Sequence, residues 1–234
     1  MALIPAAGSG ARMASEAPKQ YLRLAGMPML YHSVRCLAVE PIETVFVVLA
    51  PGDAEFARQD WGEFDGRVEP LYCGGATRRD SVYNGLVAAM DAVEAEDWVL
   101  VHDAARPCLP RADLDRLIAE VSGDAVGGLL ALPVADTVKR ARDGGARHSG
   151  GELRVEATED RSLLWLAQTP QMFRAGLLVD ALRAAAGEVT DEASAVEQLG
   201  LQPRLVKGSH QNIKVTYPED RAVAEAILAR RELR

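Results

Sequence analysis

The residues with the clearest chemical potential lie in a glycine-rich loop near the start of the chain. The sequence LIPAAGSGARM spans positions 3–13, and PKQY follows at positions 18–21. Small residues at positions 6 to 10, Gly10 included, let the backbone approach a ligand closely and direct several N–H groups toward it. Arg12 and Lys19 add two positive charges. The loop therefore predicts a binding site for a polyphosphate.

Two common glycine motifs do not fit this loop. A P-loop requires Gly-Lys followed by Ser or Thr, which occurs nowhere in the sequence. A dinucleotide fingerprint requires Gly or Ala where Met13 stands, and the next strand-end carboxylate, Asp53, lies far beyond the expected spacing of about 20 residues. A P-loop is excluded and an NAD site is disfavoured. A strand-to-helix turn that uses glycine only for its backbone conformation stays open as the alternative.

A carboxylate ends the apolar run in WVLVHDAARP, positions 98–107. We expect Asp103 at the carboxyl end of a central strand, opposite the glycine loop. It could hold Mg²⁺ there, because this ion prefers one or two carboxylates together with phosphate oxygens. A helix cap or an ion pair with Arg106 is the alternative. The side chain of His102 should point to the opposite face of the strand from that of Asp103, and we expect it to be a packed, hydrogen-bonded histidine.

A second glycine turn, GGATRRDS at positions 74–81, opens a helical pattern. Backbone exposed at paired glycines can meet the flat edge of a base, and Ser81 can cap the helix or touch the ligand. Three further polar segments carry weaker signals. Thr169 stands in one of them. Thr190 most simply caps a helix that ends before Gly200, and Lys214 would be a solvated charge in most proteins.

Strand and helix patterns alternate along the chain. Apolar runs predict strands at positions 2–6, 44–50, 68–73, 98–103, 126–133 and 204–207. Helical spacing of apolar residues follows at positions 30–37, 82–93, 114–121 and 177–182, and Pro218 opens a last helix. Such alternation indicates an α/β fold with a doubly wound, mainly parallel sheet covered on both faces. Ligands of these sheets bind at the carboxyl ends of the strands.

One polar segment, positions 140–151, interrupts this pattern. It lies between β-like stretches at positions 136–139 and 153–157, so we interpret it as the tip of a projecting hairpin. A disordered insertion at the tip is the alternative, because nothing there could form a core.

Composition limits the possible functions. With 234 residues, 48% of them hydrophobic, we expect one large α/β domain over positions 1–234 and no second domain after the last helix. No apolar run reaches the ~18 residues of a membrane span, and no charged leader precedes the first strand. A net charge of −8 without a basic block argues against nucleic acid. Three scattered cysteines favour neither disulfides nor zinc, so we expect a cytoplasmic protein.

Eight short blocks in order identify a family. PAAGSGARM, PKQY, GGATRRDSV, HDAARP, DTVKR, DRSLLWLAQTPQ, TDEASAVE and NIKVTYPED closely resemble the 2-C-methyl-D-erythritol 4-phosphate cytidylyltransferases, over positions 2 to about 230. The resemblance implies a Rossmann-like nucleotidyltransferase fold with a projecting β-arm at about positions 134–160. It also implies that CTP and the methylerythritol phosphate react to give the cytidine diphosphate sugar alcohol and pyrophosphate, with Mg²⁺ as cofactor.

The resemblance also implies a role for each matching residue. Arg12 and Lys19 would stabilise the pentacoordinate α-phosphate, and Asp103 would hold Mg²⁺. CTP would be surrounded by a set of small residues: Ala6, Ala7, Gly8, Gly10, Gly75, Ser81 and Ala104. The sugar phosphate would be handled by a polar set: Arg106, Thr137, Arg161, Thr169, Thr190 and Lys214. The arm would bring Thr137 and Arg161 across the interface of a homodimer.

The residues themselves agree with this chemistry. A phosphate monoester has a second pKa of about 6, so it attacks as a dianion and needs no general base. It does need concentrated positive charge, which Arg12, Lys19, Lys214 and Mg²⁺ could supply. Two rivals remain. Ribitol 5-phosphate cytidylyltransferases share the glycine loop, although we expect a bulkier residue where Ala104 and Ala105 stand. A non-catalytic nucleotide-binding regulator should lack Arg12 or Lys19.

Overall fold

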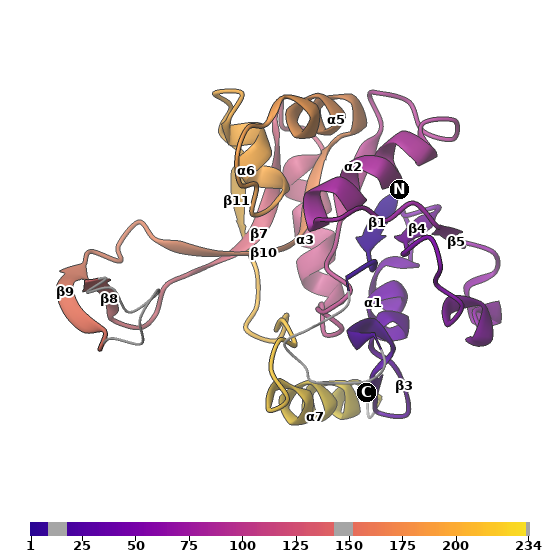
Figure 1. Ribbon diagram of the computed structural model, residues 1–234, viewed down its shortest axis with the longest axis horizontal. Helices are drawn as coiled ribbons and strands as arrows, with labels where there is room; N and C mark the ends of the chain where they lie inside the picture. The colour runs from indigo at the N-terminus through magenta and orange to yellow at the C-terminus, as the bar shows by residue number, and fades with distance from the viewer. Residues whose placement is uncertain (9–17, 143–151, 233–234) are drawn as a thin grey trace.

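A seven-stranded sheet forms the centre of the computed structural model, which describes residues 1–8, 18–142 and 152–232 (Figure 1). The strand order is β11-β7-β10-β6-β1-β4-β5. All neighbours pair in parallel except β10, which runs antiparallel to both β6 and β7. The expected doubly wound, mainly parallel sheet is confirmed. Its strands are β1 (Ala2–Pro5), β4 (Val45–Val48), β5 (Val68–Leu71), β6 (Trp98–Val101), β7 (Gly127–Pro133), β10 (Trp165–Arg174) and β11 (Arg204–Lys207).

Helices cover both faces of this sheet. The main ones are α1 (Met29–Leu37), α2 (Arg78–Ala89), α3 (Arg111–Val121), α5 (Ala175–Ala184), α6 (Glu192–Glu197) and α7 (Asp220–Glu232). Helices α1 and α3 pack on one face, and α2, α5 and α6 pack on the other. Every helix expected from apolar spacing is present.

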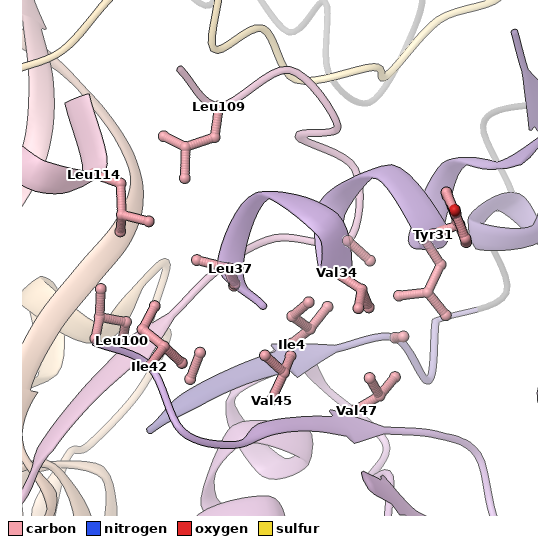
Figure 2. Close-up of a cluster of buried hydrophobic side chains, with 14 of the residues drawn as sticks. Ile4, Tyr31, Val34, Leu37, Ile42, Val45, Val47, Leu100, Leu109 and Leu114 are labelled. Carbon is pink, nitrogen blue, oxygen red and sulfur yellow. The ribbon is translucent and has the colours of Figure 1, made fainter. Parts of the chain in front are cut away.

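The two layers follow from alternation along buried strands. In β1, Ile4 points into the core under α1, whereas Leu3 points into the core under α2. Neighbouring β4 repeats the pattern with Val47 and Val48 on opposite faces. Figure 2 shows Ile4 and Val47 beneath α1, together with Val34 of that helix. Strands buried on both faces need continuous apolar runs, which is why these runs identified them.

Strand β10 is the sheet element that the sequence analysis missed. It lies between β6 and β7, in the interior of the sheet. Pro170 sits within it and offers no N–H to a neighbouring strand, and the register with β7 shifts between Ala167 and Gln171. The irregular ladder therefore accommodates the proline, although a proline normally argues against a central strand.

A two-stranded ribbon projects from the body (Figure 1). It consists of β8 (Val138–Arg142) paired antiparallel with β9 (Arg154–Glu159). Each strand lies a little further along the chain than expected, and the hairpin interpretation agrees with their pairing. Positions 140–142 of the predicted tip belong to β8, and its other positions, 143–151, lie outside the described residues.

Helix α7 packs away from the main sheet, next to a short ribbon of β2 (Arg23–Leu24) and β3 (Met27–Pro28). Its Ala224 and Leu228 bury against Leu24, Met29 and Cys108. The helix begins at Asp220, two residues after Pro218, and the Asp220 carboxylate accepts the N–H groups of the preceding turn. Within the described residues, no helix combines the length and apolar character that a membrane crossing requires.

Candidate active site

A pocket opens at the carboxyl ends of β1 and β6, where ligands of parallel sheets bind. It gathers residues from six segments of the chain: the loop after β1, the turn at Lys19, the start of α1, the start of α2, the loop after β6 and the segment before α7. Six predicted site residues line it together: Ala6, Gly8, Lys19, Asp103, Ala104 and Lys214. Their convergence from positions 6 to 214 supports a common site.

Asp103 is the electrostatic centre of this pocket. Its Oδ1 accepts from Arg78 Nε at 3.0 Å, and its Oδ2 lies 2.8 Å from Lys214 Nζ and 3.7 Å from Arg106 Nε. Burial opposes ionisation of this carboxyl, but the three positive neighbours hold its pKa well below the usual range. The ion pair with Arg106, kept open as an alternative role, is present, and the other two pairs are shorter. Asp103 is a carboxylate at every physiological pH.

Arg78 is a pocket residue that the sequence analysis did not single out. It donates to both Asp103, in the loop after β6, and Glu192 at the start of α6, with Nη2 3.0 Å from Glu192 Oε2. Burial disfavours the charged guanidinium, yet the two carboxylates raise its pKa above the usual value. Glu192 is only 1% exposed, and its carboxylate accepts from two guanidinium nitrogens of Arg78. Arg78 therefore fixes Asp103 relative to α6.

His102 is a packed histidine, as expected. It is fully buried, and its Nε2 lies 3.0 Å from the carbonyl of Arg106. A carbonyl only accepts, so Nε2 carries the proton and Nδ1 accepts from the Thr169 hydroxyl at 3.0 Å. Burial lowers the pKa of His102 to about 4. The same Thr169 oxygen accepts the N–H of Asp103 at 3.0 Å, so Thr169 holds the strand end in place.

Arg106 is buried and largely engaged with the backbone. Its Nη1 donates to the carbonyl of Asn212 at 2.7 Å, and its Nη2 lies 3.4 Å from the carbonyl of Ala167. Its Nε is left without a hydrogen bond among the described residues. Burial lowers the pKa of Arg106, and the nearby Asp103 carboxylate acts in the opposite direction. The predicted contact of Arg106 with substrate stays a prediction.

The second glycine turn lies against the first loop. A Cβ built on Gly74 would come within 2.2 Å of the Ala7 Cβ, so only glycine allows the two loops this close. Ser81 Oγ accepts the N–H of Gly75 at 3.1 Å and donates to the Thr77 carbonyl. Thr77, not Ser81, is the N-cap of α2, so the capping alternative for Ser81 was wrong.

Lys19 stands in a short 3-10 helix, η2 (Lys19–Tyr21), that supports the first loop. Next to it, Gln20 is buried and donates to the carbonyl of Ala6 at 2.7 Å. Tyr21 anchors the helix through a 2.8 Å hydrogen bond to Asp53. Lys19 is thereby held at the pocket. The predicted partners Gly10 and Arg12 lie outside the described residues.

Of the six predicted substrate residues, Lys214 lines the pocket and the other five do not; Arg106 and Thr169 are buried and contact the loop of Asp103, and the remaining three are exposed. Thr137 and Arg161 are exposed at the base of the projecting ribbon. Thr190 is exposed before α6, and the N-cap of that helix is Asp191, whose side chain accepts the N–H of Ser194 at 2.9 Å. The capping role considered for Thr190 was therefore wrong. The structure leaves its predicted contact with substrate untested.

The described residues hold no group of three or more His, Cys, Asp or Glu side chains placed to bind a metal ion. Asp103 is the ionised carboxylate that lines the pocket. One carboxylate suits Mg²⁺ that takes its other ligands from phosphate oxygens and water. The residues present fit such an ion only together with a phosphate ligand.

Comparison with known proteins gives consistent matches over the length of the chain. A family model described as IspD, 2-C-methyl-D-erythritol 4-phosphate cytidylyltransferase, matches residues 1–230. A protein of that name from Nitrosospira multiformis is 56% identical over 97% of this chain and 96% of its own length. Another from Dechloromonas aromatica is 55% identical over 99% and 98%.

Solved structures agree with these sequences. A crystal structure of 4-diphosphocytidyl-2C-methyl-D-erythritol synthase matches with a TM-score of 0.81 and 40% identity, over 97% of both chains. The Francisella tularensis 2-C-methyl-D-erythritol 4-phosphate cytidylyltransferase matches with a TM-score of 0.76 and 32% identity, over 97% of this chain and 98% of that one.

Proposed function

The chain belongs to the 2-C-methyl-D-erythritol 4-phosphate cytidylyltransferase family, and from this premise we propose how its residues perform the reaction. The enzyme transfers the cytidylyl group of CTP to 2-C-methyl-D-erythritol 4-phosphate, giving 4-diphosphocytidyl-2-C-methyl-D-erythritol and pyrophosphate. The observation that carries the proposed mechanism is the group of positive charges around Asp103, at the strand ends where a nucleotide binds.

The attacking group is the phosphate oxygen of the sugar alcohol. With a second pKa of about 6, that phosphate is mostly a dianion at neutral pH, so the step needs charge stabilisation more than a base. Its oxygen bonds to the α-phosphorus of CTP while the bond to the β-phosphate oxygen breaks, and pyrophosphate leaves with the electron pair. Lys19 and Arg12 are the residues we assign to the charge that develops on the α-phosphate.

Lys214 and Arg161 are assigned to the attacking phosphate. Lys214 is half-exposed and pairs with Asp103 at 2.8 Å, and Arg78 and Arg106 also face that carboxylate, so Asp103 stays paired when Lys214 turns toward a phosphate dianion. Thr137, Thr169, Thr190 and Arg106 complete the proposed substrate site. The small residues Ala6, Ala7, Gly8, Gly10, Gly75, Ser81 and Ala104 are assigned to CTP.

Mg²⁺ is the proposed cofactor, and Asp103 is the protein group that would hold it. The ion would neutralise part of the triphosphate charge. Asp103 suits this task because its pKa keeps it ionised and it borders the pocket. Arg78 and Lys214 would then lose part of their pairing with Asp103, and Glu192 would keep Arg78 in place.

We assign the projecting ribbon to a homodimer contact. Its β8–β9 pair stands apart from the main sheet, and a two-stranded ribbon alone is marginally stable. Leu153, Val155, Leu163 and Leu166, on the ribbon and the segment that follows it, are more than half exposed. Covering such side chains is a usual reason for association. A second subunit would also bring Thr137 and Arg161 to a neighbouring pocket, and the three free cysteines suit the proposed cytoplasmic setting.

A pyrophosphate-release assay tests the proposed function directly. With CTP and Mg²⁺, we expect turnover with 2-C-methyl-D-erythritol 4-phosphate and at least tenfold lower kcat/KM with ribitol 5-phosphate. Equal use of the two substrates would contradict the assignment of the acceptor, and release with neither would favour a nucleotide-binding regulator. Omission of Mg²⁺, with a chelator present, should abolish turnover if the cofactor proposal holds.

A further inference from the structure

A second cavity lies between helices α1 and α7. It borders the loop after β6, which carries Asp103 and is called the catalytic loop below. The cavity measures about 300 Å³ and is lined by His32, Arg35, Cys36, Val39, Pro107, Leu109, Arg111, Leu228 and Arg231. None of these residues lines the pocket at Asp103. The cavity is within the size range of small-molecule sites, which is about 300–1,000 Å³.

Three arginines from separate elements meet at this cavity. Arg35 comes from α1, Arg111 from the first turn of α3 and Arg231 from the last turn of α7. Arg111 pairs with Asp115 at 2.7 Å, but Arg35 and Arg231 have no carboxylate partner within residues 1–8, 18–142 and 152–232. Among the residues that the structure describes, no Asp or Glu lines the cavity. In a chain of net charge −8, this concentration of positive charge favours an anionic ligand.

The rest of the wall is apolar. Val39, Pro107, Leu109 and Leu228 provide it, and Leu109 is also part of the core around α1 (Figure 2). Cys36 also lines the cavity: burial raises the pKa of its thiol, while nearby Arg231 and Arg35 act in the opposite direction. An arrangement of cations beside an apolar wall fits a ligand with an anionic head and a short hydrocarbon body.

The cavity shares its wall with the loop that carries Asp103. Arg231 donates to the carbonyls of Cys108 and Leu109 at 2.6 and 3.1 Å, and the Cys36 thiol lies 3.5 Å from the carbonyl of Pro107. One turn earlier in α1, Ser33 donates to the carbonyl of Ala104 at 2.9 Å. A ligand that draws on Arg231 would therefore change the support of the catalytic loop.

We propose that this cavity is a regulatory site for an amphipathic organic anion, whose binding alters turnover at the pocket of Asp103. The ligand class is a carboxylate or phosphate head on a short apolar chain. The head would lie among Arg35, Arg111 and Arg231, and the chain would lie along Leu109 and Leu228. The proposal is independent of which sugar phosphate the enzyme accepts.

Octanoate is the probe for the test. Its carboxylate resembles the sugar phosphate less than a phosphate ester would, so it should compete less with this substrate at the pocket of Asp103. Isothermal titration calorimetry should show binding to the full-length wild-type protein. Octanamide, which lacks the charge, and acetate, which lacks the chain, should each bind at least tenfold more weakly. Saturating octanoate should change kcat even when CTP and the sugar phosphate are both saturating.

Two variants locate the site. Arg35→Glu reverses an exposed charge, and Val39→Trp fills the cavity, so each should weaken octanoate binding at least tenfold and remove the effect on kcat. Arg183→Glu, an exposed arginine on α5, is the matched control and should behave like wild type. No binding, or binding unchanged in both cavity variants, would overturn the proposed site. Binding without any change in kcat would overturn its coupling to the catalytic loop.

Discussion

At the scale of single residues, the pocket depends on a balance of charge in a small space. Asp103 and Glu192, both buried, face Arg78, and Asp103 also faces Lys214. Buried charges are stable only when they are paired, so loss of one member leaves its partner with a large desolvation cost. Substrates rich in phosphate must enter this network and redistribute its pairs. The residue predictions follow from that redistribution.

Neutralising Asp103 should separate its proposed metal role from a structural one. Asp103→Asn keeps the side-chain volume but removes the charge, so we expect kcat/KM to fall at least a hundredfold and raised Mg²⁺ to restore part of it. Steady-state assays over a Mg²⁺ series measure this. Asp113→Asn, which removes a buried carboxylate paired with Arg116 outside this pocket, is the control. A variant that keeps its activity but loses thermal stability would leave Asp103 only a structural role.

Removing a cation near the α-phosphate should affect the chemical step. Lys19→Ala or Arg12→Ala should lower kcat by roughly 10² to 10³, because each would delete one preorganised donor to the transition state. The melting temperature should change little for Lys19→Ala, since Lys19 is only half-buried. Rapid-quench measurement of the first turnover distinguishes chemistry from product release. A first turnover at the wild-type rate would remove the assigned role.

His102 should make folding stability depend on pH. Its pKa is lowered from 6.5 to about 4, so between these values the unfolded chain binds a proton that the folded chain does not. The free energy of unfolding should therefore fall with decreasing pH across this window, by up to about 3 kcal/mol. Urea unfolding of wild type and His102→Gln at pH 7 and 4.5 measures the difference. His210→Gln, an exposed histidine, should keep the wild-type slope.

Sequence separation explains which site residues were missed. Asp103, Lys19 and Lys214 stand in segments with a chemical signature. Arg78 and Glu192 are 114 positions apart, and their contact exists only after α2 and α6 pack on the same face of the sheet. In the sequence, Arg78 is one of two adjacent arginines at a helix start and Glu192 is an ordinary first-turn acid. No local pattern could reveal that they are partners.

At the scale of elements, the site is positioned by how closely the helices approach the sheet. Helix α2 carries Ser81 and Arg78 at its start, and Gly85 is one turn further along. A Cβ on Gly85 would come within 2.3 Å of Val48 Cγ2 and 3.0 Å of Leu3 Cδ1. The helix therefore lies nearer to β1 and β4 than any larger residue would permit.

Gly85→Ala tests this close approach against helix propensity. Alanine in a helix interior is favoured over glycine by about 1 kcal/mol, whereas overpacking a core typically costs about 1–3 kcal/mol. Because the contact is far inside van der Waals distance, we expect net destabilisation and a higher KM for CTP. Chemical unfolding and steady-state kinetics measure both. Gly123→Ala, with open space around its Cβ, should change stability by less than about 0.5 kcal/mol.

The elements were predictable where burial on both faces leaves a continuous apolar run. Four strands of the main sheet, β1, β4, β6 and β7, meet this condition and were expected from their sequences. The edge strands β5 and β11 were also expected, although they are less buried. Strand β10 has Gln168, Thr169, Pro170 and Gln171 in its middle, although all four are buried. Their polar groups serve the site: Thr169 holds Asp103, and Gln171 donates to Asp191 at 2.8 Å. A strand whose side chains position the site lacks the apolar pattern that reveals a strand.

At the scale of the whole molecule, the β8–β9 ribbon projects away from the main sheet (Figure 1), whereas the pocket lies at the carboxyl ends of β1 and β6. Lys19 and Lys214 line the pocket, whereas Thr137 and Arg161 flank the ribbon and are exposed. If all four residues serve one reaction, the ribbon can contribute its two residues to a pocket in another copy. In a closed two-fold dimer both subunits use the same surface, so one interface would bring an arm to each of the two pockets. The alternative is a monomer whose own ribbon closes over its pocket.

Complementation between two inactive variants decides between these arrangements. Arg161→Ala chains supply an intact pocket, and Lys19→Ala chains supply an intact arm. After exchange of subunits in an equal mixture, half of the dimers are mixed and half of the sites in them are intact, so about a quarter of wild-type activity should return. Mixing Lys19→Ala with Lys19→Ala,Arg161→Ala chains controls for recovery by other routes. If exchange is demonstrated by mass spectrometry and activity stays at the level of the variants alone, Arg161 serves the pocket of its own chain, and the ribbon acts within one subunit.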